Sequence, residues 1–389
     1  MSTTTLDKLF SDFNKACKSE VFTMGNVIHT CERIPFTSPD ANRILHGGIP
    51  RGRVIEFFGA EGSGKTTTAL DVVANAQRVF HEEYESEVAS LTELEENGSL
   101  KGKAKERLAY LKERGEKLVL WVDTENTFDD EWAETLGVDV SNMWMMSPGS
   151  NYAEQIFEVV IQAIDTDKLG LVVIDSLAMM LSKQEAEKTV EDKVYGGISM
   201  ALSRFSREVE SICARTNCAL IGINQMRENL NAAGYGGPTY TTPGGKCWKH
   251  ACSVRLMFKA GTPFDSNFVK INKSDPNPFG HKVEISVTKT KVCKPDRKVG
   301  SYTLTYSGGI QPLIDMIELA ETEGILIKSG SWYSFVDTET GEVFTQTDEN
   351  GKVDAIKVCG KPKLIVFLSE PENEKILLAV KKAVDDLIA

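Results

Sequence analysis

From Val54 onwards the chain alternates between short apolar runs and longer stretches in which apolar residues recur at helical spacing. The apolar runs that end in turn residues are Val54–Phe58, Leu118–Asp123, Met143–Met146, Leu171–Asp175 and Ala219–Asn224. Between them, Ile156, Val160 and Ala163 fall on one face of a helix. This alternation predicts an α/β fold in which a mostly parallel, twisted sheet is covered by helices on both faces.

The pattern changes twice towards the C-terminus. Apolar runs at 253–258, 283–288 and 302–306 have no helices between them, which favours an antiparallel extension of the sheet. After residue 309 a helical pattern, a hairpin pattern and a closing helical pattern follow. We therefore expect a core over residues 35–309 and a small α+β C-terminal domain over 310–389.

The first 34 residues are expected to form an N-terminal arm of one helix and a short extended piece near Val21. Leu6, Leu9 and Phe13 share one helical face, and a stretch rich in Pro and Ser then separates the arm from the core. Such an arm either packs on its own domain or takes part in self-association, and the pattern leaves both open.

One stretch interrupts the alternation of strands and helices. Residues 81–117 contain ten acidic and seven basic residues, with Leu108 and Leu111 at helical spacing. A solvated helical hairpin accounts for this composition, and a partner-binding surface is the alternative.

Composition narrows the classes of protein to consider. The 389 residues are 41% hydrophobic and 26% charged, and no apolar run approaches the roughly 18 residues of a membrane span. No signal-peptide pattern is present and the eight cysteines are scattered without a C-x-x-C pair, so we expect a cytoplasmic protein. A net charge of −12 disfavours nonspecific coating of nucleic acid but leaves room for a local basic lining.

Residues 59–66 match the G-x-x-x-x-G-K-[ST] spacing of a P-loop, with an apolar run before them and a helical pattern after them. Small residues let successive backbone N–H groups turn around a phosphate, while Lys65 reaches the β- and γ-phosphate oxygens and Thr66 binds Mg²⁺. The alternative, a glycine-rich surface turn, leaves both flanks unexplained. The expected nucleotide-binding residues are Gly59, Ala60, Glu61, Gly62, Ser63, Gly64, Lys65, Thr66 and Thr67.

Polar residues at the ends of three other apolar runs can complete an ATPase site. Asp175 is expected to join Thr66 in holding Mg²⁺. Glu125 can polarise the water that attacks the γ-phosphate, or it is only a helix cap or salt-bridge partner. Gln225 ends a third run, where a side chain can sense whether the γ-phosphate is present.

A long glycine-rich loop follows Gln225. The segment from Arg227 to Lys246 is too long for a plain connection, and it carries Tyr235 and Tyr240 among its glycines. Flexible glycines, tyrosines that stack on bases and basic neighbours are typical of a loop that binds single-stranded nucleic acid. Taken alone, the stretch is equally consistent with an ordinary mobile loop.

Together these motifs resemble those of the RecA-type homologous recombinases, particularly the bacterial and phage branch. The resemblance covers about residues 5–388 except 81–117, which the bacterial enzymes lack. It rests on residues 59–67, 122–125, 173–176, 223–227, 242–246, 289–291 and 330–333. It implies a RecA-type core and an ATP-dependent DNA recombinase. With ATP and Mg²⁺, such an enzyme forms helical filaments on single-stranded DNA, pairs it with double-stranded DNA and exchanges strands. The family docks its N-terminal arm on the neighbouring subunit, so the resemblance implies that residues 1–34 are a polymerisation arm.

The resemblance also implies roles for individual residues. The family's catalytic positions fall on Glu125, Lys65, Gln225, Lys289 and Lys291, and its metal-binding positions on Thr66 and Asp175. Asp129 and Trp132 fall where the family hydrogen-bonds to adenine and stacks on it, with tryptophan in place of the usual tyrosine. The lysine pair reaches the ATP of a neighbouring subunit in the family, although a Lys-x-Lys on an edge strand is more often solvated.

Two loops bind DNA in the family. The implied DNA-binding residues are Lys188, Lys193, Tyr195, Arg207, Arg227, Tyr235, Tyr240, Gly244, Gly245 and Lys246. The first loop, which follows Ser176 and spans about residues 186–197, departs from the bacterial pattern, and no long acidic tail follows residue 389. With the insertion at 81–117, these departures favour a phage-encoded, UvsX-like member. A single-strand-binding protein and a loading mediator are its implied accessory partners.

Two alternatives belong to other classes. A hexameric helicase shares the ATPase core, but it normally supplies an arginine finger where this chain has Lys289 and Lys291. A mediator paralogue that does not exchange strands would not need an intact Lys65, Glu125 and Asp175.

Overall fold

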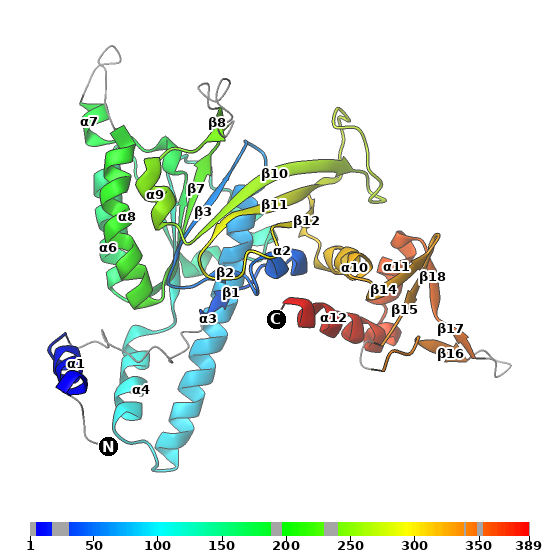
Figure 1. Cartoon of the computed structure of the whole chain (residues 1–389), viewed down its shortest axis with the longest axis horizontal. Coiled ribbons are helices and arrows are strands. Elements are labelled where there is room, and N and C mark those ends of the chain that lie inside the picture. Colours follow the sequence, from blue (N-terminus) through cyan, green and yellow to red (C-terminus); the bar gives the residue numbers. More distant parts are fainter. Residues whose placement is uncertain are drawn as a thin grey trace. The chain divides into compact units, whose positions relative to one another are not determined.

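The computed structural model describes residues 5–17, 31–187, 197–228, 240–337, 340–347 and 353–388 (Figure 1). The chain divides into two compact units, Met1–Glu32 and Arg33–Ala389. The expected limits at residues 34 and 309 therefore remain predictions, because core and C-terminal region fall within one unit.

The described part of the first unit is mainly the helix α1, Thr5–Cys17. Its apolar residues Leu6 and Leu9 are 60% and 59% exposed, and Phe13 is also exposed. The predicted helix is confirmed, while the extended piece expected near Val21 lies outside the described residues.

The second unit is organised around a nine-stranded sheet in the order β13-β12-β11-β10-β3-β7-β6-β4-β5. Its strands are β3 (Val54–Gly59), β4 (Leu118–Asp123), β5 (Met143–Met146), β6 (Leu169–Asp175), β7 (Ala219–Gln225), β10 (Val254–Phe264), β11 (Gly280–Thr290), β12 (Val299–Thr305) and β13 (Gly309–Ile310). Neighbours from β10 to β5 are parallel, and those from β10 to β13 are antiparallel. The mostly parallel sheet and its antiparallel extension are thus confirmed, with β10 pairing in both ways.

Helices cover both faces of this sheet because successive strand residues point to opposite sides. Ile55 and Phe57 of β3 pack in one core with α3 (Lys65–Glu96), whereas Val54 packs in a second core with α6 (Ala153–Asp165) and α8 (Gly197–Thr216). In the second core the rings of Phe157 and Phe205 stack with centroids 4.3 Å apart.

Shorter elements connect these layers. They are β1 (Arg33–Ile34), α2 (Pro39–Ile44), β2 (Ile49–Pro50), α5 (Asp130–Thr135), α7 (Lys183–Ala186), β8 (Arg227–Glu228), β9 (Tyr240–Thr241) and α9 (Gly245–Ala251). Capping residues fix where several of these helices begin. At the start of α2 the Ser38 hydroxyl accepts a hydrogen bond from the Ala41 N–H, and Pro39 is the first helical residue.

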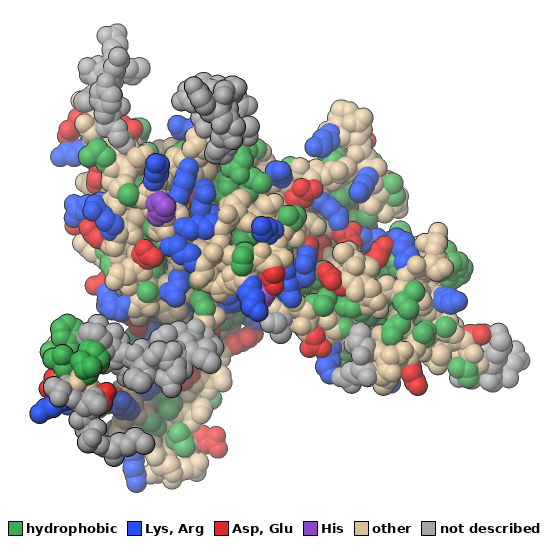
Figure 2. All heavy atoms as spheres, in the orientation of Figure 1, with side chains coloured by type: hydrophobic (Ala, Val, Ile, Leu, Met, Phe, Trp, Pro, Cys, Tyr) green, Lys and Arg blue, Asp and Glu red, His purple; other side chains and the backbone are tan. Residues whose placement is uncertain are grey.

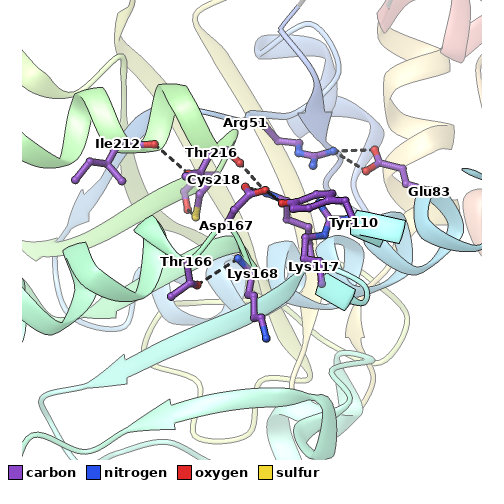
Figure 3. Close-up of polar contacts among 12 residues, drawn as sticks. Arg51, Glu83, Tyr110, Lys117, Thr166, Asp167, Lys168, Ile212, Thr216 and Cys218 are labelled. Atoms are coloured by element: carbon purple, nitrogen blue, oxygen red, sulfur yellow. Dashed lines mark hydrogen bonds and ion pairs between the residues drawn. The ribbon is translucent and has the colours of Figure 1, made fainter. Parts of the chain in front are cut away.

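The charged stretch forms a helical hairpin, as predicted, but its first half is not a separate helix. Helix α3 continues from the P-loop to Glu96 without a Gly or Pro, and α4 (Lys103–Arg114) packs back against it. Figure 3 shows polar contacts at the base of this hairpin, where it joins the rest of the unit. Arg51 binds Glu83 of α3 at 2.7 and 2.8 Å, Tyr110 of α4 donates to Asp167, and Lys117 donates to Asp167 and to the Thr216 carbonyl, both at 2.7 Å.

The C-terminal region builds its own small core. A three-stranded sheet of β14 (Leu326–Ser329), β15 (Trp332–Phe335) and β18 (Lys357–Cys359) packs against α10 (Pro312–Thr322), α11 (Lys361–Ser369) and α12 (Glu374–Ile388). A separate pair joins β16 (Thr345–Thr347) to β17 (Val353–Ala355). The predicted α+β character is confirmed. In the described part of the chain no helix has both the length and the apolarity to cross a membrane.

Candidate nucleotide and DNA site

The P-loop joins the end of β3 to the start of α3 and has the backbone that this turn requires. Gly62 and Gly64 adopt φ of +66° and +90°, in the left-handed region that favours glycine. A Cβ on Gly59 would lie 2.4 Å from the Phe258 carbonyl oxygen, whereas one on Gly62 would meet only open space. The first N–H groups of α3 have no acceptor within the helix, so the loop offers donors to an anion beside an open surface.

Lys65, the first residue of α3, is directed back at this loop. Its side chain is buried, and its ammonium donates to the Ala60 carbonyl at 2.7 Å. Burial lowers the pKa of Lys65, while Asp175, Glu125 and Glu61 act in the opposite direction. The Lys65 ammonium therefore lies at the mouth of the P-loop with carboxylates around it.

Thr66 and Asp175 meet across the ends of two strands. The Thr66 hydroxyl donates to Asp175 Oδ2 at 2.7 Å. Burial, with Glu125 and Asp123 adding to it, raises the pKa of Asp175 to about 6. Within the described ranges no group of three or more Asp, Glu, His or Cys side chains could hold a metal unaided. One hydroxyl and one carboxylate instead fit Mg²⁺ that arrives with phosphate oxygens and keeps its waters.

Glu125 is oriented from two neighbouring strand ends. The Ser176 hydroxyl donates to Glu125 Oε1 at 2.5 Å, and Gln225 Nε2 donates to the same oxygen at 3.3 Å. The turn that carries Glu125 is held by buried Asp123, whose carboxylate accepts from the N–H groups of Glu125 at 3.2 Å and Phe128 at 3.0 Å. The three predicted residues Glu125, Asp175 and Gln225 thus do lie at one edge of the sheet.

Asp129 and Trp132 lie at the start of α5. Asp129 caps this helix by accepting from the Trp132 N–H at 3.0 Å, and the Trp132 indole N–H approaches the Thr67 hydroxyl at 3.4 Å. The indole is therefore beside the first turn of α3, on the side where the P-loop ends.

The ammonium groups of Lys289 and Lys291 make hydrogen bonds within the protein, unlike those of a lysine pair that is only solvated. The Lys289 ammonium donates to the carbonyls of Lys249 at 2.6 Å and His250 at 3.0 Å, and the Lys291 ammonium donates to the His250 carbonyl at 2.7 Å. These carbonyls end α9, where the helix dipole favours cations. Burial, followed by the charge of Lys291, lowers the pKa of Lys289.

The fold and this geometry agree with the sequence comparisons. A family model described as the RecA N-terminal domain matches residues 9–83 and 98–311. Protein RecA of Bacteroides thetaiotaomicron is 31% identical over 359 residues, which are 92% of this chain and 90% of that protein. Protein RecA of Aquifex aeolicus is 32% identical over 296 residues, 76% of this chain and 72% of that protein.

The chain belongs to the RecA family. Its activity is that of the family, an ATP-dependent DNA recombinase with DNA-dependent ATP hydrolysis, rather than that of a hexameric helicase or a mediator paralogue. The break in the family model at residues 84–97 falls in the distal part of the α3–α4 hairpin.

The residues expected to bind DNA are only partly described. Lys188, Lys193, Tyr195 and Tyr235 lie outside the described residues. Arg207 is exposed on α8, and Arg227 and Tyr240 lie on the short paired strands β8 and β9. Gly244 and Gly245, with φ of +98° and +69°, lead into α9, on which Lys246 is exposed.

Basic side chains gather on this side of the RecA-family core despite the net charge of −12. Figure 2 shows them over the region of α8, α9 and the adjoining strands β10 and β11. Around α9 the basic residues include Lys246 and Lys249 of α9, Arg255 of β10, Lys289 of β11 and Lys291, which follows β11.

Several contacts that organise the site were not predicted from the sequence. By resemblance, Ser176 belongs with Asp175 to the strand end that binds Mg²⁺, but its hydrogen bond to Glu125 was not foreseen. Asp123 was visible only as part of a motif, and its contacts with the Glu125 turn were not foreseen either. Glu56 is a fully buried carboxylate inside the apolar strand β3, and a charged residue in such a run is the signal that could have drawn attention to it.

Proposed function

We propose that this RecA-family chain binds MgATP through the P-loop, Thr66 and Asp175, and hydrolyses it with Glu125 as the carboxylate that activates water. The observation that carries the proposal is the doubly held Glu125 carboxylate beside the Thr66–Asp175 pair and Lys65. When bound, Mg²⁺ would neutralise charge on the phosphates. Asp129 and Trp132 are the proposed adenine-contacting residues.

The steps assigned to the protein are positioning and charge stabilisation. Lys65 would exchange the Ala60 carbonyl for β- and γ-phosphate oxygens, where its charge stabilises the transition state. Gln225 donates to the Glu125 carboxylate, so its side chain would sense the γ-phosphate and the water that Glu125 orients. A change in this hydrogen bond on hydrolysis would then move the segment that follows Gln225.

A second subunit would complete the site. Lys289 and Lys291 would leave the carbonyl end of α9 to reach the triphosphate of a neighbour in a helical filament, because a triphosphate is a stronger anion than a helix end. The filament would form on single-stranded DNA, contacted through the two loops and their flanking residues Arg207, Arg227 and Lys246.

The biological setting is a narrower proposal. The interrupted family match at 84–97 and the departures in the first DNA loop support a phage-encoded, UvsX-like member acting in the cytoplasm of an infected cell. A single-strand-binding protein and a loading mediator would be its accessory partners.

The test is Glu125→Gln, with Glu134→Gln as a matched control at an exposed glutamate of α5. Loss of the activating carboxylate is expected to slow DNA-stimulated hydrolysis by about 10²-fold while ATP binding is retained, so that DNA filaments persist. Single-turnover hydrolysis and filament dissociation are measured. Parental turnover and parental DNA release in Glu125→Gln would contradict the assignment.

A further inference from the structure

A buried polar cluster lies beside the nucleotide site, on the face of the sheet opposite to the Gln225 side chain. Its centre is Glu56 of β3, whose side chain is fully buried. The two parallel neighbours of β3 supply its partners: Arg255 of β10 donates Nε to Glu56 Oε2, and Asn224 of β7 donates Nδ2 to Glu56 Oε1 at 2.8 Å. A buried carboxylate is retained only when it is paired in this way.

Both partners of Glu56 also bind the last part of the second DNA loop, residues 227–246, where the loop returns to the core. Asn224 Nδ2 donates to the Pro243 carbonyl at 3.2 Å, and an Arg255 guanidinium nitrogen donates to the Thr242 hydroxyl at 3.3 Å. Thr242 is itself buried. Two successive loop residues are therefore fastened to the same carboxylate through two different strands.

The cluster is directly continuous with the nucleotide-facing groups. Asn224 precedes Gln225 on β7, and adjacent residues of a strand point to opposite faces of the sheet. Gln225 contacts Glu125 on one face, while Asn224 contacts Glu56 and Pro243 on the other. A shift of the end of β7 would therefore change both sets of contacts together.

Two further contacts show that the cluster lies tightly between the strands and the loop exit. The Arg255 guanidinium lies over the Phe58 ring at 4.7 Å, and that ring is 6.0 Å from the ring of Tyr240 on β9. Within the described structure, Asn224 Oδ1 is buried without a hydrogen-bond donor. A buried amide oxygen without a donor is costly and rare in native structures.

We propose that Asn224, Glu56 and Arg255 form a positioning cluster that couples the state of Gln225 to the placement of the loop exit at Thr242 and Pro243. These residues would not touch ATP. They would transmit nucleotide occupancy to DNA affinity, and DNA occupancy back to hydrolysis, as any coupling between two sites must be reciprocal. The inference rests on the proposed function of Gln225 and the DNA loop.

The decisive variants break single contacts and leave the Glu56–Arg255 ion pair intact. Asn224→Ala removes the amide bridge, Thr242→Val removes one hydroxyl at nearly constant volume, and Thr242→Ser restores that hydroxyl. Arg51→Gln is the control, because it alters an arginine–glutamate contact away from this cluster, between the buried Arg51, which precedes β3, and the half-exposed Glu83. Measurements on the full chain are ATP binding, hydrolysis without and with single-stranded DNA, and the ratio of DNA dissociation rates in ADP and in a nonhydrolysable ATP analogue.

We expect ATP binding and DNA-independent hydrolysis to stay within about twofold of the parent in Asn224→Ala and Thr242→Val. DNA stimulation and the dissociation-rate ratio should each fall about tenfold, which is within the usual range of coupling between sites. Thr242→Ser and Arg51→Gln should keep both. Such a split distinguishes coupling from simple loss of stability, which would lower ATP binding as well.

Parental stimulation and parental rate ratios in both Asn224→Ala and Thr242→Val would overturn the inference. If Asn224→Ala fails to fold, Thr242→Val against Thr242→Ser decides the matter alone. Absence of DNA stimulation in the parent chain would instead contradict the proposed function, so the two failures are distinguishable.

Discussion

The two ends of helix α3 show two ways of using one continuous element. Its amino-terminal turn is surrounded by buried groups: Lys65 bonds the P-loop, and Thr66 bonds Asp175. Its distal part, beyond Glu83, lies in a hairpin held by exposed charges such as the Arg107–Glu87 pair, at 2.7 and 2.8 Å.

The difference lies in what each end can tolerate. Contacts among buried charges are strong because water does not compete, and each partner depends on the others. Exposed ion pairs contribute little individually, so the distal hairpin can vary in length and sequence without disturbing the site. The family match is continuous through the first end and breaks at the second.

The largest expected effect is on ATP hydrolysis and comes from the amino-terminal end of α3. Lys65→Ala removes the side-chain cation of the P-loop and should reduce ATP hydrolysis by about 10²- to 10³-fold or more, since such charge-stabilising donors commonly contribute that much. Steady-state hydrolysis with saturating DNA is the measurement. Turnover near the parental rate would remove the central role of this end of α3.

A second variant asks whether the amino-terminal end of α3 is complete within one subunit. Lys289→Ala combined with Lys291→Ala should leave ATP binding by an isolated subunit intact but abolish DNA-stimulated hydrolysis. Lys294→Ala, at an exposed lysine three residues further on, is the control.

Mixing the double lysine variant with Lys65→Ala sharpens this test. Some interfaces then combine an intact P-loop with a neighbour's intact lysines, and activity should return in proportion to their statistical share. Parental DNA-stimulated hydrolysis by the unmixed double variant would show that the pair serves only to cap α9.

A pH dependence follows from the buried Asp175. Its pKa of about 6 lies above the ordinary value, so the proton is bound below that pH and must leave before Mg²⁺ can take the carboxylate. MgATP affinity should therefore fall as pH drops through about 6, approaching tenfold per pH unit, and level off above it.

The control for this dependence is Asp175→Asn. It shares the titration of the nucleotide itself, so the difference between the two pH profiles isolates Asp175. Superimposable profile shapes for parent and Asp175→Asn would contradict the prediction.

The smallest effects belong to the hairpin. Arg107→Ala should lower the free energy of unfolding by less than about 1 kcal/mol and leave DNA-stimulated hydrolysis unchanged. Arg51→Ala, which removes a buried guanidinium from Glu83, should cost more, about 1.5–3 kcal/mol. Denaturant unfolding measures both losses. Equal losses in the free energy of unfolding would contradict the predicted difference between the base and the distal part of the hairpin.

Local sequence patterns predicted the parts of this molecule that depend on neighbouring residues along the chain. The apolar run before Gly59, the glycine spacing and the helical pattern after Lys65 predicted the strand, turn and helix that the structure contains. Glu125, Asp175 and Gln225 were expected at one edge because parallel strands end on the same side, and their contacts confirm that placement.

Contacts between distant segments were beyond such reasoning. Glu56 and Arg255 are 199 residues apart, and no spacing rule pairs them. The lysine pair was expected to meet either solvent or a neighbour's anion. In the structure it binds carbonyls of α9, which come within reach of the lysines only when α9 has folded and packed beside them. The unbroken continuation of α3 was predictable in principle, because no Gly or Pro occurs between Lys65 and Asn97.

That continuity makes α3 a lever arm. Its 32 residues span about 48 Å at the rise of an α-helix. Arg51 holds the helix at Glu83, so the free part of the arm is residues 84–96, about 20 Å at the same rise. A rotation of about 5° at Glu83 would carry the far end through about 2 Å at that length. A fluorescent probe placed near Gly98 would then read the state of the nucleotide from outside the site, without touching either ATP or DNA.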